Sequence, residues 1–293
     1  MDSAAVKISA KTKVYAVIGC PIGHSFSPAI HNTLSELLNI DMTYNAFKVE
    51  PEGLKTAIDG AYQLGIQGLN VTVPHKQEVM KTLCRIDAFA VQIGAVNTLK
   101  YTTDGYEGYN TDVFGLEECI KSRGVELKGK IMVLIGAGGA AKAAAVMAAA
   151  NQVSRLYIVN RTIKNAEDIA ANIKKYYNNI EVFCLGYDEI EKIENIDICV
   201  QTTSKGMSPN VEQTPIESKE FFKKCKFAVD IIFNPWETEF LRLARENGCM
   251  AVNGFDMLFY QAVKSYEIWN EIKVPLDIKI KAKELLEKYY TKR

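Results

Sequence analysis

The segment at residues 131–150, IMVLIGAGGAAKAAAVMAAA, constrains the fold more than any other part of the chain. A short apolar run leads into a glycine-rich turn, and a long alanine-rich stretch follows it. Gly136, Gly138 and Ala141 match the pattern G-x-G-x-x-(G/A), in which glycines form a tight turn between a strand and a helix. Backbone N–H groups at the start of such a helix can bind a pyrophosphate. A glycine-rich turn without a ligand is the alternative interpretation.

The end of the next apolar run, about twenty residues further on, indicates which dinucleotide would bind. NAD-binding turns place an Asp or Glu there, and its carboxylate binds the ribose 2′-hydroxyl. This chain has Asn160, Arg161 and Thr162 instead. Lys164 follows, and the next carboxylate is Glu167. A guanidinium and a hydroxyl suit a 2′-phosphate through charge-assisted hydrogen bonds, so the segment favours NADP. A solvated surface arginine is the alternative.

Short apolar runs alternate with longer amphipathic runs, which is typical of βαβ units and a largely parallel sheet. In the N-terminal half the pattern predicts strands at 13–19, 42–49 and 68–74, helices at 27–39 and 51–65, and a hairpin at 95–107. In the C-terminal half it predicts a strand, turn and helix at 130–151, and strands at 155–162, 180–185, 196–203 and 227–233. Further helices are predicted at 112–123, about 255–272 and 276–290.

Composition narrows the class of partner. Lys+Arg and Asp+Glu both number 35, so nothing in the charge balance indicates a nucleic-acid or membrane partner. No apolar run reaches the roughly 20 residues that a membrane span needs. The 7 cysteines lack a C-x-x-C spacing, and the 3 histidines are not clustered with them, so no metal site is expected. We expect a cytoplasmic protein with reduced thiols.

Polar residues recur at the ends of apolar runs in the N-terminal half, as a small hydroxylated substrate would require. They are Asn70, Thr72, Lys76, Asn97, Thr98, Asn110, Thr111 and Asp112. Ser25 and Ser27 stand near the start of a predicted helix, where two hydroxyls can bind a carboxylate. Ser27 before Pro28 would also be a suitable N-cap. Turn chemistry could explain each of the other residues, and Lys76 alone could be a solvated charge.

Taken together, these motifs resemble the shikimate dehydrogenases. The resemblance extends through nearly the whole chain, in the same order: GHSFSP…HN, NVTVPHK, GAVNT, GYNTDVFG, GAGGAA, NRT, TTSKGM, DIIFNPWET and NGFDMLFYQA. That family reduces 3-dehydroshikimate to shikimate with NADPH, in the biosynthesis of aromatic amino acids. The resemblance implies an α/β substrate-binding catalytic domain at 1–113, completed by C-terminal helices at 255–293. It also implies a Rossmann-type NADP-binding domain at 114–254.

The resemblance implies a role for each matching residue. The substrate carboxylate would be bound by Ser25 and Ser27, and the ring hydroxyls by Thr72, Asn97, Asp112 and Gln261. The catalytic pair would be Lys76 and Asp112. The pyrophosphate would lie on Gly136, Ala137, Gly138, Gly139 and Ala140. The adenosine 2′-phosphate would lie on Asn160, Arg161, Thr162 and Lys164, and the nicotinamide near Ile231 and Gly254.

The chemistry gives an independent reason for a lysine. Hydride delivery to a ketone creates a developing alkoxide, which needs a proton donor or a cation within hydrogen-bond reach. A lysine pKa of roughly 10.4 is too high for an efficient base at neutral pH. Burial would lower it, whereas a carboxylate such as Asp112 would raise it. Our hypothesis is that Lys76 orients and polarises the reacting oxygen and shares proton transfer with Asp112.

Two positions depart from the family pattern. Phe233 stands where the family usually has a tyrosine that helps to bind the substrate carboxylate, and the lost hydrogen bond is worth about 0.5–1.5 kcal/mol. This leaves room for quinate as the substrate. Gln201 stands where asparagine is common, and we expect little effect. A dehydrogenase for another cyclic polyol acid and a non-catalytic NADP-binding regulator are the other functions considered. A monomer and a homodimer are both compatible with the sequence.

Overall fold

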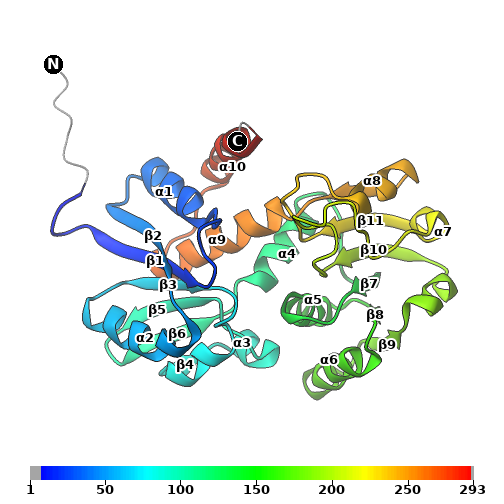
Figure 1. Ribbon diagram of the computed structural model, residues 1–293, viewed down its shortest axis with the longest axis horizontal. Helices are drawn as coiled ribbons and strands as arrows, with labels where there is room; N and C mark the ends of the chain where they lie inside the picture. Colours follow the sequence, from blue (N-terminus) through cyan, green and yellow to red (C-terminus); the bar gives the residue numbers. More distant parts are fainter. Residues whose placement is uncertain (1–7, 292–293) are drawn as a thin grey trace. The chain divides into compact units, whose positions relative to one another are not determined.

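The computed structural model describes residues 8–291, which form two compact units (Figure 1). The first unit contains the chain up to Thr111 together with the chain from Gln261 onward. The second unit is the continuous segment Asp112–Tyr260. The sequence placed these boundaries after residues 113 and 254. The second boundary differs because helix α9, Phe255–Asn270, continues across it without a break.

The first unit is built on a mixed six-stranded sheet of order β2-β1-β3-β5-β6-β4. The strands are β1 (Lys13–Gly19), β2 (Met42–Lys48), β3 (Gly68–Val71), β4 (Arg85–Ile86), β5 (Thr98–Thr102) and β6 (Gly105–Tyr109). β1 pairs in parallel with β2 and β3, whereas β5 and β6 form the predicted antiparallel hairpin. The carboxyl end of β3 and the start of β5 therefore lie side by side, with Asn70 opposite Thr98.

Helices cover this sheet with apolar faces. They are α1 (Ser27–Leu38), α2 (Leu54–Gln63), α3 (Ala88–Ile93), the part of α9 from Gln261 onward, and α10 (Leu276–Thr291), with short 3₁₀ turns at Pro51–Gly53 and Glu78–Thr82. One core cluster lies between α2 and the strands and includes Leu54, Ile58 and Leu69. On α9, Trp269 is buried and its indole N–H donates to the Leu99 carbonyl at 2.8 Å. This bond fixes the helix to the sheet.

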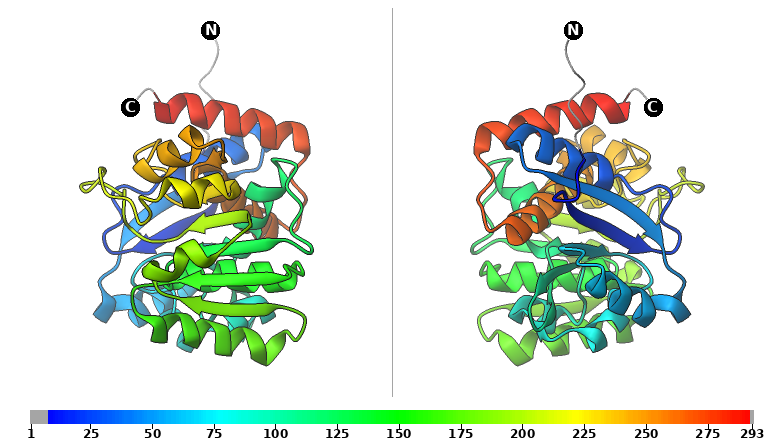
Figure 2. Two further views of the ribbon diagram at one scale, coloured as in Figure 1. Left: turned by 90° about the vertical axis from the view of Figure 1, so that its right-hand side faces the viewer. Right: turned by 90° about the vertical axis from the view of Figure 1, so that its left-hand side faces the viewer.

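The second unit is built on a fully parallel six-stranded sheet of order β12-β11-β10-β7-β8-β9 (Figure 2). The strands are β7 (Ile131–Ile135), β8 (Arg155–Val159), β9 (Glu181–Leu185), β10 (Ile196–Gln201), β11 (Cys225–Asp230) and β12 (Met250–Val252). The helices are α4 (Asp112–Lys121), α5 (Gly139–Ala150), α6 (Ile163–Tyr176), α7 (Lys219–Lys223), α8 (Glu239–Glu246) and the start of α9, with a 3₁₀ turn at Tyr187–Lys192.

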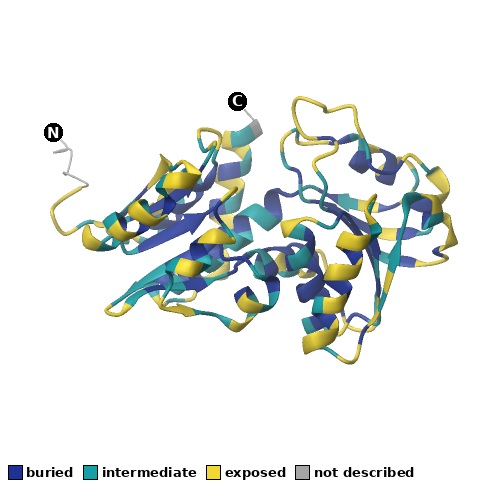
Figure 3. Ribbon diagram, turned by 60° about the horizontal axis from the view of Figure 1, so that its bottom comes forward, coloured by how far each residue is buried: buried dark blue, intermediate teal, exposed yellow. Residues whose placement is uncertain are grey.

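This strand order reverses between β7 and β10, because the chain proceeds from β7 to β8 and β9 and then crosses to β10. Open parallel sheets bind ligands at such a switch point, beyond the carboxyl ends of the strands. The central strands are buried, whereas the outward faces of the covering helices are exposed (Figure 3). The fold therefore confirms the predicted α/β class and the Rossmann-type second half.

Several predictions about local structure were wrong, and among them the strands predicted at 68–74 and 155–162 end at Val71 and Val159. The strand predicted at 227–233 ends at Asp230, because the carboxyl group of Asp230 accepts the N–H of Ile232 and turns the chain. Ser27 is not the N-cap of α1: the helix begins at Ser27, and its cap residue is Phe26 without a side-chain hydrogen bond. Strands β4 and β12 and helix α3 were not predicted. No helix in the described part of the chain is long and apolar enough to cross a membrane, and its His, Cys, Asp and Glu residues form no group suited to a metal ion.

Candidate functional site

The glycine turn of the second unit lies between β7 and α5, at the switch point of the sheet. Gly136 has φ 107°, and a Cβ there would lie 2.7 Å from Thr202 Oγ1, so only glycine fits. Gly138 and Gly139 are exposed, and a Cβ on either would meet nothing within 4 Å. The backbone at the start of α5 is therefore accessible at both glycines, and the N–H groups of a helix N-terminus suit a pyrophosphate. The residues present fit a dinucleotide.

The predicted 2′-phosphate residues lie at the carboxyl end of β8, next to β7. Asn160 Nδ2 donates to the Thr162 carbonyl at 2.9 Å, which fixes the turn before α6. Arg161 is exposed. Burial raises the pKa of Tyr187, and the positive charge of Arg161 acts in the opposite direction. Lys164 forms an exposed ion pair with Asp168 at 3.0 Å, one helical turn further along α6.

The predicted nicotinamide residues follow β11 and β12. A Cβ on Gly254 would overlap the carbonyl of Ile231 and lie 2.9 Å from its Cα. The Gly254 N–H donates to the Ile232 carbonyl at 3.0 Å. The two predicted residues are therefore in direct backbone contact. Phe233 is half-buried in the loop after β11.

In the first unit, amide and hydroxyl groups form one buried hydrogen-bond network. Its members lie on β3, β5 and α9, directly before β5, or between β6 and α4: Asn70, Asn97, Thr98, Thr111 and Ser265. Asn97 Oδ1 accepts the Thr111 N–H and the Thr98 hydroxyl, both at 2.9 Å. Asn70 Nδ2 donates to the Asn97 carbonyl at 3.1 Å and to Thr98 Oγ1 at 3.0 Å. This network holds the amide of Asn97 in one orientation.

Helix α9 joins this network through Gln261 and Ser265. Ser265 Oγ lies 2.8 Å from Thr98 Oγ1 and 3.2 Å from Thr111 Oγ1. The Thr111 hydroxyl also donates to Gln261 Oε1 at 3.4 Å. The predicted substrate residues Asn97 and Gln261 are therefore brought together through Thr111. The sequence analysis singled out Thr111 but assigned it no role, and it missed Ser265. Ser265 faces the network because it lies one helical turn after Gln261.

A second branch connects the network to the predicted carboxylate site. The Tyr44 hydroxyl donates to Asn70 Oδ1 at 2.6 Å. Burial raises the pKa of Tyr44, and a hydrogen bond with Ser27 opposes that effect. Ser25 Oγ accepts the Ser27 N–H at 3.3 Å. The aromatic ring of Phe26, between the two serines, packs against Tyr289 and Tyr290 of α10. The loop with both serines is thus held from the core and from the C-terminal helix.

The turn after β3 carries Thr72, His75 and Lys76. The backbone N–H of Thr72 donates to the Ile18 carbonyl at 3.0 Å, which holds Thr72 next to β1. His75 is buried and its Nε2 lies 2.7 Å from the Val49 carbonyl, so its role is structural. Lys76 is half-buried, and its carbonyl accepts the Val96 N–H at 2.8 Å, next to Asn97. The backbone at Lys76 is therefore tied to the segment that carries Asn97.

Asp112 is the first residue of α4 and directly follows Thr111 in the chain. It begins the second unit, whereas Lys76 and Thr111 belong to the first. Asp112 therefore stands at the covalent link between the two units.

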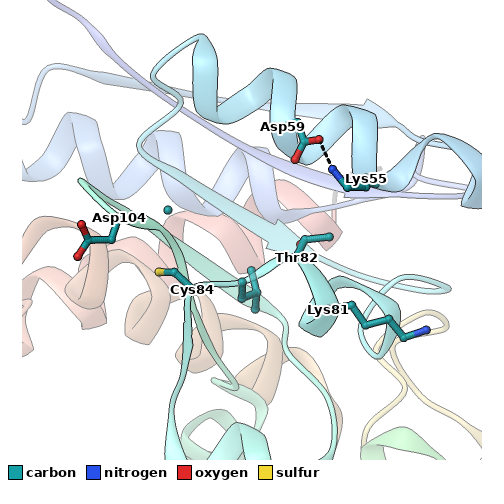
Figure 4. A pocket seen from close by; sticks show the side chains of 8 residues that line it. Lys55, Asp59, Lys81, Thr82, Cys84 and Asp104 are labelled. Carbon is teal, nitrogen blue, oxygen red and sulfur yellow. Dashed lines mark hydrogen bonds and ion pairs between the residues drawn. The ribbon is translucent and has the colours of Figure 1, made fainter.

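A separate pocket of about 390 Å³ lies elsewhere in the first unit (Figure 4). It is lined by Lys55, Asp59, Lys81, Thr82, Leu83, Cys84, Asp104 and Gly105. Lys55 and Asp59 form an ion pair at 2.6 Å, and Lys81 pairs with Glu78 at 2.7 Å. None of the predicted site residues lines it.

The second unit has a parallel sheet with a glycine turn at its switch point, and the first is an α/β unit rich in buried amides and hydroxyls. Together in one chain, these features define a dinucleotide-dependent oxidoreductase. Known proteins identify it further. Residues 17–99 match the family model "Shikimate dehydrogenase substrate binding domain", and residues 118–238 match "Shikimate / quinate 5-dehydrogenase". The chain belongs to the shikimate dehydrogenase family.

Individual relatives agree over almost their full length. The shikimate dehydrogenase (NADP(+)) of Methanococcus aeolicus is 42% identical over 271 residues, which are 92% of this chain and 96% of the relative. The structure of shikimate 5-dehydrogenase from Listeria monocytogenes in complex with shikimate and NAD is 31% identical, with a TM-score of 0.89 and coverage of 95% and 98%. A shikimate dehydrogenase structure in complex with NADP+ is 38% identical, with a TM-score of 0.85 and coverage of 94% and 96%.

Proposed function

We propose that this protein catalyses the NADP-dependent, reversible reduction of 3-dehydroshikimate to shikimate, in the biosynthesis of aromatic amino acids. The relatives that match it over nearly their whole length carry this activity in their names. The observation that carries the proposal is the buried network of the first unit, in which Asn97 and Gln261 are held through Thr111. Oriented amides and hydroxyls of this kind are suited to a small polyhydroxylated acid.

We assign substrate binding to the first unit. Ser25 and Ser27 bind the carboxylate at the start of α1, where helix N–H groups favour an anion. Thr72, Asn97 and Gln261 bind the ring hydroxyls, together with Asp112. Phe233 stands where the family usually has a tyrosine and donates no hydrogen bond to the carboxylate. Oxidation of quinate is therefore a second candidate activity.

We assign cofactor binding to the second unit, whose glycine turn fits a dinucleotide. Residues 136–140 bind the pyrophosphate. The 2′-phosphate is bound by Asn160, Arg161, Thr162 and Lys164. The nicotinamide is contacted by Ile231 and Gly254. The bound cofactor supplies the hydride. Lys76 orients and polarises the substrate oxygen, where negative charge develops, and shares the proton transfer at that oxygen with Asp112.

The activity is tested by absorbance at 340 nm, with shikimate and quinate each tried against NADP and NAD. We expect the largest kcat/KM for shikimate with NADP, and a larger value for quinate would reverse the substrate assignment. No change in absorbance with any combination would refute the proposed function.

Two variants test the assigned roles. We expect Lys76→Ala to lower kcat by at least about 100-fold, whereas Lys81→Ala, in an exposed ion pair, keeps normal activity. Near-normal turnover of Lys76→Ala with only a raised KM would refute the catalytic role. Arg161→Ala should raise KM for NADPH by about tenfold or more and leave KM for NADH unchanged. Arg155→Ala, at the opposite end of β8, is its control.

We further propose a cytoplasmic location and a monomer or homodimer. All 7 cysteines of the chain are free thiols, as a reducing compartment would leave them. Light scattering coupled to size-exclusion chromatography measures the oligomeric state directly.

A further inference from the structure

The second unit contains a buried carboxyl group that has no role in the proposed reaction. Asp230 is the last residue of β11 and is 0% exposed. Its register partner on β10 is Gln201, which is equally buried. No ion pair involves Asp230 in the part of the chain that the structure describes. A carboxyl group in such a place is costly unless neutral groups satisfy it, so its hydrogen bonds are informative.

Three neutral donors surround the carboxyl group of Asp230. Oδ2 accepts the Thr238 hydroxyl at 2.6 Å. Oδ1 accepts the Ile232 N–H at 3.0 Å and Gln201 Nε2 at 3.4 Å. Burial raises the pKa of Asp230 to about 7, and these hydrogen bonds act in the opposite direction. An asparagine at this position would keep an oxygen that accepts from Ile232 and Gln201, whereas its Nδ2 would donate to Thr238 Oγ1, so the Thr238 hydroxyl would accept there and no longer donate.

Two loops meet at this carboxyl group. In the loop after β10, Gln201 Oε1 accepts the Thr203 N–H, and Nε2 donates to the Thr203 and Lys205 carbonyls, each at 3.2 Å. The loop after β11 ends at Thr238, the N-cap of α8. A Cβ on Gly206 would lie 3.3 Å from Thr238 Cβ, so the loops are in close contact. Asp230 therefore holds both loops at one point.

The residues assigned to the nicotinamide, Ile231 and Gly254, are in direct backbone contact with the two loops that Asp230 holds together. The Ile231 N–H donates to the Gln201 carbonyl at 3.1 Å. Gly254 packs on the Ile231 backbone so closely that no Cβ fits, and its N–H bonds to the Ile232 carbonyl. A change in the turn at 230–232 would therefore move Ile231 and Gly254 together.

We infer that Asp230 is a positioning residue: through Ile232 and Thr238 it fixes the backbone of Ile231 and Gly254, and thereby the place of the nicotinamide ring. The inference rests on the proposed function for the assignment of those two residues. The inference predicts that replacement of Asp230 does not affect binding of the adenosine half of the cofactor, at the other side of the switch point.

Three variants and one control test this. Asp230→Ala removes the carboxyl group, Asp230→Asn keeps its shape, and Thr238→Val removes only one donor. The control is Asp197→Ala, near the start of β10, where the side chain pairs with Lys226. For each we would measure kcat with shikimate, the Kd of NADPH, and the fluorescence of bound NADPH, which depends on the surroundings of the nicotinamide.

We expect Asp230→Ala to lower kcat by about 10- to 100-fold, and Thr238→Val to lower it to a lesser degree. Both should change the fluorescence of bound NADPH and leave its Kd within about threefold, because pyrophosphate and 2′-phosphate contacts dominate affinity. Asp230→Asn should keep kcat within about threefold. Equal losses in Kd and kcat, or failure of Asp230→Asn to restore activity, would overturn the inference. If the wild type binds NADPH without oxidising shikimate, the proposed function fails, and the fluorescence of the variants still decides this inference.

Discussion

Gly68 of β3 lies directly against Trp269 of helix α9, and its replacement by alanine is a stringent test of the first unit. A Cβ there would lie 2.6 Å from Trp269 Cε2 and 2.7 Å from Cδ1, and closer still to Nε1. The indole cannot move aside easily. Its N–H is bonded to Leu99, and its ring packs on Tyr15 with centroids 5.0 Å apart. Alanine must therefore push α9 away from the sheet.

The cost of Gly68→Ala has two parts. Overpacking of a close-packed core costs about 1–3 kcal/mol. Loss of the hydrogen bond from Trp269 to Leu99 adds about 0.5–1.5 kcal/mol. We therefore expect the free energy of unfolding of the first unit to fall by about 1.5–4.5 kcal/mol. Gly60→Ala is the matched control: its Cβ in α2 would meet nothing within 4 Å, and alanine should stabilise the helix by about 0.5–1 kcal/mol.

The assay is urea unfolding followed by tryptophan fluorescence. The chain has 2 tryptophans, Trp269 in the first unit and Trp236 in the second. A Trp236→Phe background therefore makes the signal specific for the first unit. Because α9 also carries Gln261, Gly68→Ala should raise KM for shikimate as well. A Gly68→Ala protein as stable as wild type would show that the close packing of α9 on β3 is wrong.

Other perturbations have equally definite outcomes. Tyr44→Phe leaves the buried Asn70 Oδ1 without its donor, so urea unfolding should show a loss of about 1–3 kcal/mol. Tyr290→Ala removes a ring that packs edge-on against Phe26 at 5.6 Å, and initial rates should show a higher KM for shikimate with a smaller change in kcat. Burial raises the pKa of Asp230 from 3.8 to about 7, so the folded state binds the proton more tightly. Its stability contribution is therefore full below about pH 4 and is lost as pH rises towards 7, by about 4 kcal/mol at 1.36 kcal/mol for each pKa unit. Thermal unfolding of Asp230→Asn should lack this component of the pH dependence, and an unchanged slope would contradict it.

Much of the fold was predictable because its signals are local. The run from Ile131 to Ala150 contains a strand, a glycine turn and a helix former in sequence order, and the structure places them as β7 and α5. The end of β11 was not predictable from periodicity. The apolar pattern continues to Phe233, but a side-chain bond from Asp230 to the backbone of Ile232 ends the strand. Short strands such as β12 give too little pattern to detect.

The site was predictable only in part, and the reason is again physical. Motif residues such as Asn97 and Gln261 were found by resemblance, and the structure connects those two within one network. Ser265 was missed because nothing in its neighbourhood distinguishes it from a surface serine of a helix. Its significance arises from contact with Thr98 and Thr111, more than 150 positions earlier in the chain. Such long-range contacts leave no trace in a local pattern.

The discontinuous first unit has a consequence for biosynthesis. Its strands and the helices α1, α2 and α3 come before Thr111 in the chain, but Trp269 of α9 and the whole of α10 come after Gln261. On the ribosome, at about 5–20 residues per second, Trp269 follows Tyr260, the last residue of the second unit, by about 0.5–2 s. During this interval the face of β1 and β3 that Trp269 will bury stays open to solvent. Transiently exposed apolar surface promotes aggregation, so the growing chain is most exposed to aggregation before α9 packs on this face of the sheet.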